Sequence, residues 1–304
     1  MKKTTAFLTR FTTFVVLAIL AYSCGDPVPE PTLQVFSSVD GYQVAFTATA
    51  TNADSYAWDF GDGETSTEQN PVHTYASSGS FTATCTVTGE GGTADASTEV
   101  TIAASEMEML TGGSSMADGK TWVFSPTASE GDGIYYANAD MEFQEPLPDG
   151  ILGLIGLPSE YEDEFIFKHD GTYTHDVKND SVVTDLVFAM LNQLEYRPSA
   201  EDVVVLCPFT PAAATFTYAE AAGLTLEVTD QDTPEESSDV TWDGVTVLEI
   251  AGGEFIGVMD FTRKYIVFEI TPDKMVLGIF ISTTAGSKAD KPTHFLRMTF
   301  VPKS

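Results

Sequence analysis

Short runs of alternating apolar and polar residues, separated by turn residues, fill most of the chain after residue 32. In residues 81–87 every second residue is apolar, which is the pattern of a strand with one face in a core. Two further runs meet at Asp170 and Gly171, a turn sequence typical of hairpins. Residues 184–194 are the one predicted helix, because apolar residues recur there every three or four positions. The sequence therefore predicts an all-β fold.

Turn and linker residues divide the chain into two predicted domains. Gly112 and Gly113, followed by serines, interrupt the strand pattern shortly after residue 105. We expect a small β-sandwich before this point and a larger antiparallel β-sandwich or barrel with one short helix after it; residues 255–259 are among the strands of the larger domain. The predicted signal peptide, proline-rich tether, first domain, linker and second domain are residues 1–23, 24–32, 33–104, 105–118 and 119–304.

The first 23 residues have the parts of an export signal in the right order. Lys2 and Lys3 precede an uncharged apolar stretch, residues 11–22, and the small residue Ser23 precedes Cys24. A helix of that length reaches under about 20 Å, too short for a hydrocarbon core of about 30 Å. The segment is similar to the lipobox of bacterial lipoproteins, which implies a lipid on Cys24 and an outer-membrane, surface-exposed protein. Ordinary secretion with cleavage near Ser23 is the alternative.

The chain is strongly acidic, with 45 Asp and Glu against 14 Lys and Arg and a net charge of −31 at pH 7. Such a surface repels nucleic acid and anionic headgroups, so neither is an expected ligand. No cofactor is predicted, although Ca²⁺ in the acidic loops stays open. Cys85 and Cys207 fall in different predicted domains, and we expect both to be free, buried thiols.

Three linked motifs mark the first domain: residues 57–63 read AWDFGDG, residues 71–75 read PVHTY and residues 79–84 read GSFTAT. The pattern places Trp58 and Phe60 in the core, and the aspartates between the glycines can bond the free amides of a tight turn. These motifs resemble the PKD domain, which implies an immunoglobulin-like sandwich that acts as a spacer or interaction module.

The histidine of the second motif, His73, has two explanations. It could ligate a metal together with Asp59 and Asp62. A lone histidine in a structural motif is more often a hydrogen-bonded packing residue, and we expect that role here.

The order of parts in the whole chain carries a second resemblance. After the lipobox and the PKD-like motifs come GKTW at residues 119–122, FKHDGTY at residues 167–173 and GGEFIG at residues 252–257. This order is similar to the cell-surface glycan-binding lipoproteins of starch-utilisation-type systems. The resemblance implies noncatalytic binding of polysaccharide or oligosaccharide, with an outer-membrane transporter complex and glycoside hydrolases as partners.

Sugar binding needs flat aromatic faces and a few acids or amides placed on a rigid sheet or its loops. The candidates are therefore aromatic residues in loops with acidic neighbours. They form two groups, Tyr135, Tyr136, Asp132 and Asp140 in the first long loop and Trp242, Asp239 and Asp243 in the acidic segment 230–243. Core packing is the alternative for Trp242 and for one of the two tyrosines. Trp122 is assigned to the core.

The sequence carries no His-Glu-x-x-His, Gly-x-Ser-x-Gly or phosphate-binding glycine motif, so we expect no enzymatic activity. The acids of residues 160–164 are interpreted as a solvated strand edge, and a metal site of His169 and His175 is a minor alternative. Two further hypotheses stay open. One is a structural or adhesive surface lipoprotein with β-sandwich spacers, and the other is a divergent glycosidase.

Overall fold

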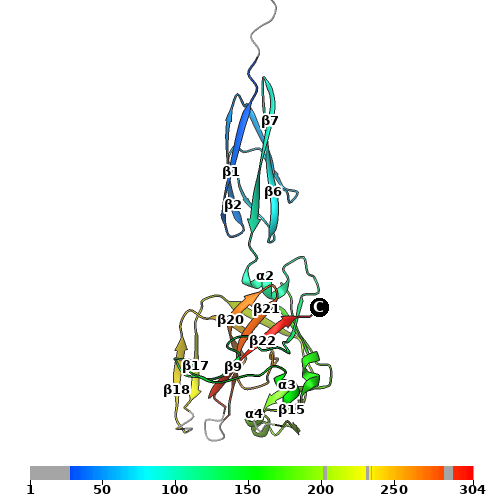
Figure 1. The fold of residues 1–304 in the computed structure, drawn as a ribbon, viewed down its shortest axis with the longest axis vertical. Helices are drawn as coiled ribbons and strands as arrows, with labels where there is room; N and C mark the ends of the chain where they lie inside the picture. The colour runs from blue at the N-terminus through cyan, green and yellow to red at the C-terminus, as the bar shows by residue number, and fades with distance from the viewer. Residues whose placement is uncertain (1–27, 201–203, 231–232, 234, 284–289, 304) are drawn as a thin grey trace, which may run out of the picture. The chain divides into compact units, whose positions relative to one another are not determined.

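The computed structural model describes residues 28–200, 204–230, 233, 235–283 and 290–303, which divide into two compact units at residues 104 and 105 (Figure 1). The predicted signal peptide and Cys24 lie outside the described residues. No helix in the described ranges is long and apolar enough to cross a membrane. Each unit is described separately below.

The first unit is a sandwich of two antiparallel sheets. One sheet has the order β1-β2-β5 and the other the order β4-β3-β6-β7. The strands are β1 (Thr32–Asp40), β2 (Gln43–Thr51), β3 (Ser55–Asp59), β4 (Thr65–Ser66), β5 (Val72–Thr74), β6 (Gly79–Gly89) and β7 (Gly92–Ile102). Trp58, Phe60 and the free thiol of Cys85 are buried between the sheets, as the alternation predicts.

The turn after β3 is held by the two aspartates of its motif. Asp59 accepts a hydrogen bond from the Gly61 amide at 2.9 Å, and Asp62 accepts one from the Glu64 amide at 3.0 Å. The other carboxyl oxygen of Asp62 lies 2.7 Å from His73 Nε2, and the His73 ring stacks on Phe60 at 4.1 Å between centroids. His73 is therefore the packing residue that the sequence predicts.

We expect Gly61→Ala to destabilise the first unit more than Gly63→Ala. Both glycines have positive φ, a conformation that costs an alanine about 1–2 kcal/mol. A Cβ on Gly61 would lie 2.7 Å from the Thr82 carbonyl oxygen, whereas one on Gly63 would meet nothing within 4 Å. Gly61→Ala therefore adds an overpacking term of about 1–3 kcal/mol. Urea unfolding of the full chain measures the difference, and equal losses would contradict this packing.

Among the described residues of the second unit, eight antiparallel strands form a closed ring in chain order. They are β8 (Lys120–Phe124), β11 (Glu164–Phe167), β12 (Thr172–Asp176), β16 (Ala214–Ala219), β19 (Thr246–Ile250), β20 (Lys264–Thr271), β21 (Lys274–Ile281) and β22 (His294–Pro302). The ring closes where β22 pairs with β8, with Phe300 opposite Phe124. The predicted sandwich or barrel is thus an up-and-down barrel.

Three insertions and one preceding helix, α2 (Glu106–Thr111), complete the second unit. The first insertion holds β9 (Gly133–Tyr136), β10 (Phe143–Pro146), α3 (Ile151–Leu154) and the 3₁₀ helix η1 (Pro158–Glu162). The second holds β13 (Ser181–Asp185), α4 (Leu186–Leu191), β14 (Arg197–Pro198) and β15 (Val204–Pro208), and the third is the hairpin of β17 (Leu224–Thr229) and β18 (Ser237–Trp242).

The predicted helix at residues 184–194 is shorter in the structure. Asp185 ends β13, and its carboxylate accepts a hydrogen bond from the Phe188 amide at 2.9 Å. An aspartate at this position satisfies an amide that the first helical turn leaves without a partner. The helix α4 therefore begins only at Leu186.

The barrel interior is filled by side chains and by one loop. Trp122 is fully buried there, as predicted. The predicted strand at residues 255–259 is wrong, because residues 252–260 form a loop whose Ile256 and Val258 pack among the inward-facing residues. Gly257 lies so close to the barrel wall that a Cβ would be 2.5 Å from Ile279. We call residues 252–260 the plug loop.

Candidate functional site

A groove of about 400 Å³ lies between β9 and the β17–β18 hairpin, and we call it the hairpin groove. In Figure 1 the hairpin, drawn in yellow, lies beside the barrel. One aromatic ring, two acids and several hydroxyl and amide groups share the lining with three small or branched apolar residues. The lining consists of Tyr136, Ala137, Asn138, Glu142, Val228, Thr229, Asp230, Ser238, Val240 and Thr293.

Strand alternation decides which side chains of the hairpin face the groove. Leu226 and Val228 of β17 belong to the cluster that packs on the outer surface of the barrel, together with Val240 and Trp242 of β18. The residues that alternate with these along the two strands, such as Asp239, point away from the barrel. Ser238 and Val240 therefore line the groove, while the exposed Asp239 lies on the opposite face of the hairpin.

The two neighbouring tyrosines of β9 lie on opposite faces of the sheet. Tyr136 pairs with His294 of β22, packs on its ring at 4.9 Å between centroids, and lines the groove. Tyr135 stacks on Phe295 at 5.0 Å and donates a hydrogen bond to the Gly131 carbonyl at 2.8 Å. Of this pair, Tyr136 lines the groove and Tyr135 does not.

Two predicted ligand-binding residues are buried. Trp242 is 3% exposed, packs on Phe280, and donates a hydrogen bond from Nε1 to the Asn138 carbonyl at 2.9 Å. Asp132 is 5% exposed and accepts a hydrogen bond from the Ser129 amide at 2.9 Å. Their burial contradicts the prediction that these side chains contact sugar. Trp242 instead positions Asn138, which lines the groove.

The remaining predicted acids are exposed at the edges of this region. Asp140 lies in the loop between Asn138 and Glu142, and Asp243 follows β18. Sequence reasoning missed Asn138 and Glu142, although both flank the predicted Asp140. It also missed Thr293, for which the sequence holds no signal, because its place depends on the register of β22 with β9.

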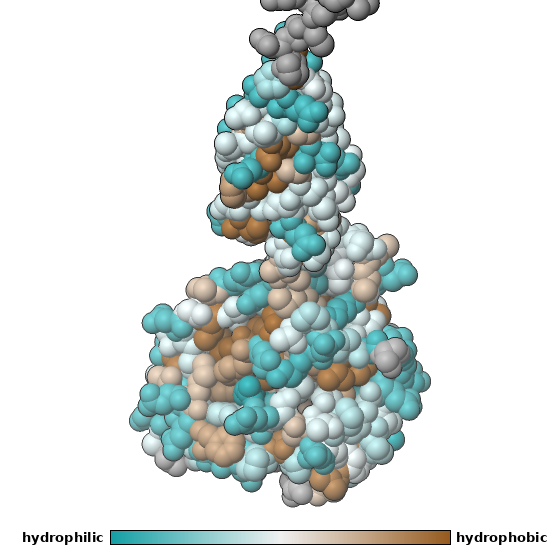
Figure 2. All heavy atoms as spheres, turned by 45° about the horizontal axis from the view of Figure 1, so that its top comes forward, coloured by the Kyte–Doolittle hydropathy of each residue, from teal (hydrophilic) through white to brown (hydrophobic). Residues whose placement is uncertain are grey.

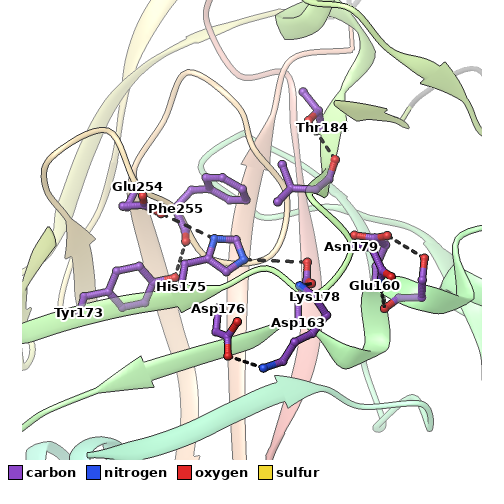
Figure 3. A network of polar contacts seen from close by, with 12 residues as sticks. Glu160, Asp163, Tyr173, His175, Asp176, Lys178, Asn179, Thr184, Glu254 and Phe255 are labelled. Atoms are coloured by element: carbon purple, nitrogen blue, oxygen red, sulfur yellow. Dashed lines mark hydrogen bonds and ion pairs between the residues drawn. The ribbon is translucent and has the colours of Figure 1, made fainter. Parts of the chain in front are cut away.

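A second polar cluster is buried inside the barrel (Figure 3). His175 lies between two carboxylates, with Nε2 at 3.9 Å from Asp163 and Nδ1 at 3.6 Å from Glu254, and all three side chains are at most 3% exposed. Burial lowers the pKa of His175, but the two carboxylates outweigh it and hold the pKa above its ordinary value. Tyr173 donates a hydrogen bond to the Phe255 carbonyl of the plug loop.

This cluster overturns two sequence-based interpretations. Residues 160–164 are not a solvated edge, because Glu160, Asp163 and Glu164 are all buried. His169 is exposed at the hairpin turn, so it does not meet His175 in a metal site. Within the described ranges, no group of three or more His, Cys, Asp or Glu side chains is placed to hold a metal ion.

A second buried acid pair connects the plug loop with β13. Asp260 of the plug loop accepts a hydrogen bond from the Ser282 amide at 2.8 Å. Burial, and then the charge of Asp260, raises the pKa of Asp185 to about 8, and burial raises the pKa of Asp260 to about 6. Burial likewise raises the pKa of Glu160 to about 7.

We expect the second unit to be more stable at about pH 5 than at about pH 8. A carboxyl whose pKa is higher in the folded chain than in the unfolded chain binds more protons in the folded state. The free energy of unfolding therefore falls as the pH rises from about 4 to the pKa of the folded chain. The raised pKa of His175 acts in the same direction above its unfolded value. Asp185→Asn keeps a helix-capping side chain without a titrating group and should flatten this dependence. Urea unfolding across this range tests it, and stability that rises with pH would contradict it.

Comparison with known proteins identifies the first unit. Residues 25–104 match the PKD domain family, so this unit is a PKD domain. A stretch of 61 residues is 43% identical to the pre-pro-metalloprotease PrtV of Vibrio cholerae, and this covers 19% of the chain but only 7% of that protease. The PKD1 domain of the same protease is 33% identical over 24% of this chain and 98% of that one, with a TM-score of 0.24.

A further solved structure spans both units. Its title concerns the promiscuous specificity of carbohydrate-binding modules from the β-sandwich superfamily. The likeness covers 91% of this chain and 92% of that one at 11% identity, with a TM-score of 0.26. A likeness this distant says nothing about what the second unit binds.

Proposed function

We propose that this protein is a noncatalytic lipoprotein of the cell surface that binds polysaccharide or oligosaccharide in the hairpin groove. The observation that carries the proposal is the composition of that groove, where one aromatic ring lies among acid, amide and hydroxyl groups. The C–H faces of a sugar pack on aromatic rings, and its hydroxyls bond to acids and amides. A volume of about 400 Å³ also lies in the range of small-ligand sites.

The groove is built on rigid elements. Tyr136 lies on a strand that pairs with both β10 and β22. Asn138 is fixed from below by the buried Trp242, and its side chain accepts a hydrogen bond from the Glu142 amide at 3.1 Å. Such support holds polar groups in place before a ligand arrives, which reduces the entropy lost on binding.

The rest of the chain would present this groove to large polymers. In the proposed arrangement a lipid on Cys24 anchors the protein in the outer membrane, the proline-rich tether extends from it, and the PKD domain acts as a spacer. The captured glycan then passes to partner glycoside hydrolases and to a transporter complex. The chain itself catalyses no reaction in this proposal.

We expect Tyr136→Ala to weaken glycan binding about tenfold, because the loss of one aromatic face removes about 1 kcal/mol or more. Tyr136→Phe keeps the ring and should bind nearly as the wild type does. Tyr135→Phe, on the opposite face of the sheet, is the matched control. Affinity electrophoresis and calorimetry against a polysaccharide panel measure the effect. If the folded wild type retains no polysaccharide, the proposal fails; release of reducing ends would instead reveal a glycosidase.

We expect Cys24→Ser to release the protein from the membrane fraction, because serine cannot carry the thioether-linked lipid. Incorporation of labelled palmitate into the wild type, and its absence from the variant, would be the matching chemical evidence. Protein that stays in the membrane fraction without label would contradict the anchor and would favour another mode of attachment.

A second candidate function is adhesion through protein contacts. Figure 2 shows apolar areas on the drawn faces of both units. Phe36 and Val72 of the first unit are 58% and 60% exposed. Such residues are commoner at interaction surfaces when they cluster. Only one predicted aromatic residue lines the hairpin groove, which also favours this candidate. Absence of glycan retention by the folded wild type would support it further.

A further inference from the structure

A second cavity, of about 820 Å³, opens where β21 ends and β22 begins, and we call it the mouth pocket. Ile281 and Leu296 form part of its lining, and both belong to the same cluster as the side chains inside the barrel. Ile134 of β9 continues this inward-facing surface beyond the end of β8. The walls come from the first insertion, through residues 144–148 and α3, and from Val204 of β15.

The mouth pocket is mainly apolar. Ten of its fourteen described lining residues are Ile, Leu, Val or Pro, which sets it apart from the polar hairpin groove. Leu154 of α3 lines the pocket and is 65% exposed. An exposed apolar side chain is ordinary when isolated, but here it borders a concave apolar surface whose burial by a ligand would be favourable.

Two polar groups of the mouth pocket, His294 and Thr283, lie next to each other. His294 Nδ1 is 3.1 Å from the Thr283 hydroxyl and 2.9 Å from the Thr293 hydroxyl. Burial lowers the pKa of His294, so its ring is uncharged at neutral pH. Within the described part of the lining, Glu145 is the one charged residue and there is no Lys or Arg. An anionic ligand would therefore meet a like charge at Glu145.

We propose that the mouth pocket binds an uncharged amphiphile, a molecule with a hydrocarbon chain and a hydroxyl or carbonyl group. The chain would contact Leu154, Ile281 and Leu296, and the polar group would exchange hydrogen bonds with His294 and Thr283. The volume lies within the range of about 300–1,000 Å³ typical of small-molecule sites, which occur in the mouths of β-barrels. The two cavities share no lining residue, although Tyr136 and Thr293 of the hairpin groove contact His294 of the mouth pocket.

The test uses the full chain and the uncharged fluorescent probe Nile red. We expect saturable binding of one probe per chain, displacement by decanol, and displacement by decanoate that is weaker by about tenfold or more because its charge is desolvated near Glu145. Absence of saturable binding would overturn the proposal. Equal displacement by decanoate would overturn the assignment to an uncharged ligand.

Two arginine substitutions locate the probe. Leu154→Arg places a charge in the mouth pocket at an exposed position and should weaken probe binding about tenfold or more. Met190→Arg is the matched control, because Met190 is 56% exposed and does not line the pocket. An equal effect of both variants, or no effect of Leu154→Arg, would place the probe elsewhere and contradict the proposal.

Discussion

The pairing of the last strand with the first determines the form of the second unit. β8 has five residues and β22 has nine, so β8 can cover only one end of β22. The other end of β22 pairs with β9, which returns from the first insertion. This mismatch in length places Tyr136 and Ile134 on a strand that extends past the barrel, and both cavities lie against that extension. The closed ring and the two candidate binding sites are thus consequences of one pairing.

The barrel interior combines close apolar packing with a few buried polar groups, whose removal from water costs free energy. His175 between Asp163 and Glu254 is held away from water, where each charge needs its partner. Glu254 and Asp260 both belong to the plug loop, so these contacts connect a segment without regular structure to the strands around it. Replacing one member of such a group would leave its partners buried and unpaired. This would destabilise the protein more than an apolar core at the same place would.

Local signals explain how much of this structure the sequence predicts. The turn at residues 59–64 follows from its own glycines and aspartates, and the hairpin at Asp170 follows from its Asp-Gly pair. Residues 255–259 have the sequence pattern of a strand, but they belong to the plug loop, whose apolar side chains pack inside the barrel. Trp242 and the acids of residues 160–164 have polar surroundings in the sequence, and only the fold buries them. Tyr136, predicted in a loop, instead ends β9 and lines the hairpin groove.

The eight barrel strands pair in the order in which they occur in the chain. Every pairing except one therefore joins consecutive strands of the barrel. The exception, between β8 and β22, joins residues 122–124 to residues 300–302. A contact of such long sequence separation forms late and slowly. During synthesis, which exposes the N-terminal part first, the PKD domain can complete its core while the barrel stays an open sheet with two bare edges. The pairing of residues 300–302 with β8 thus removes both exposed sheet edges at once.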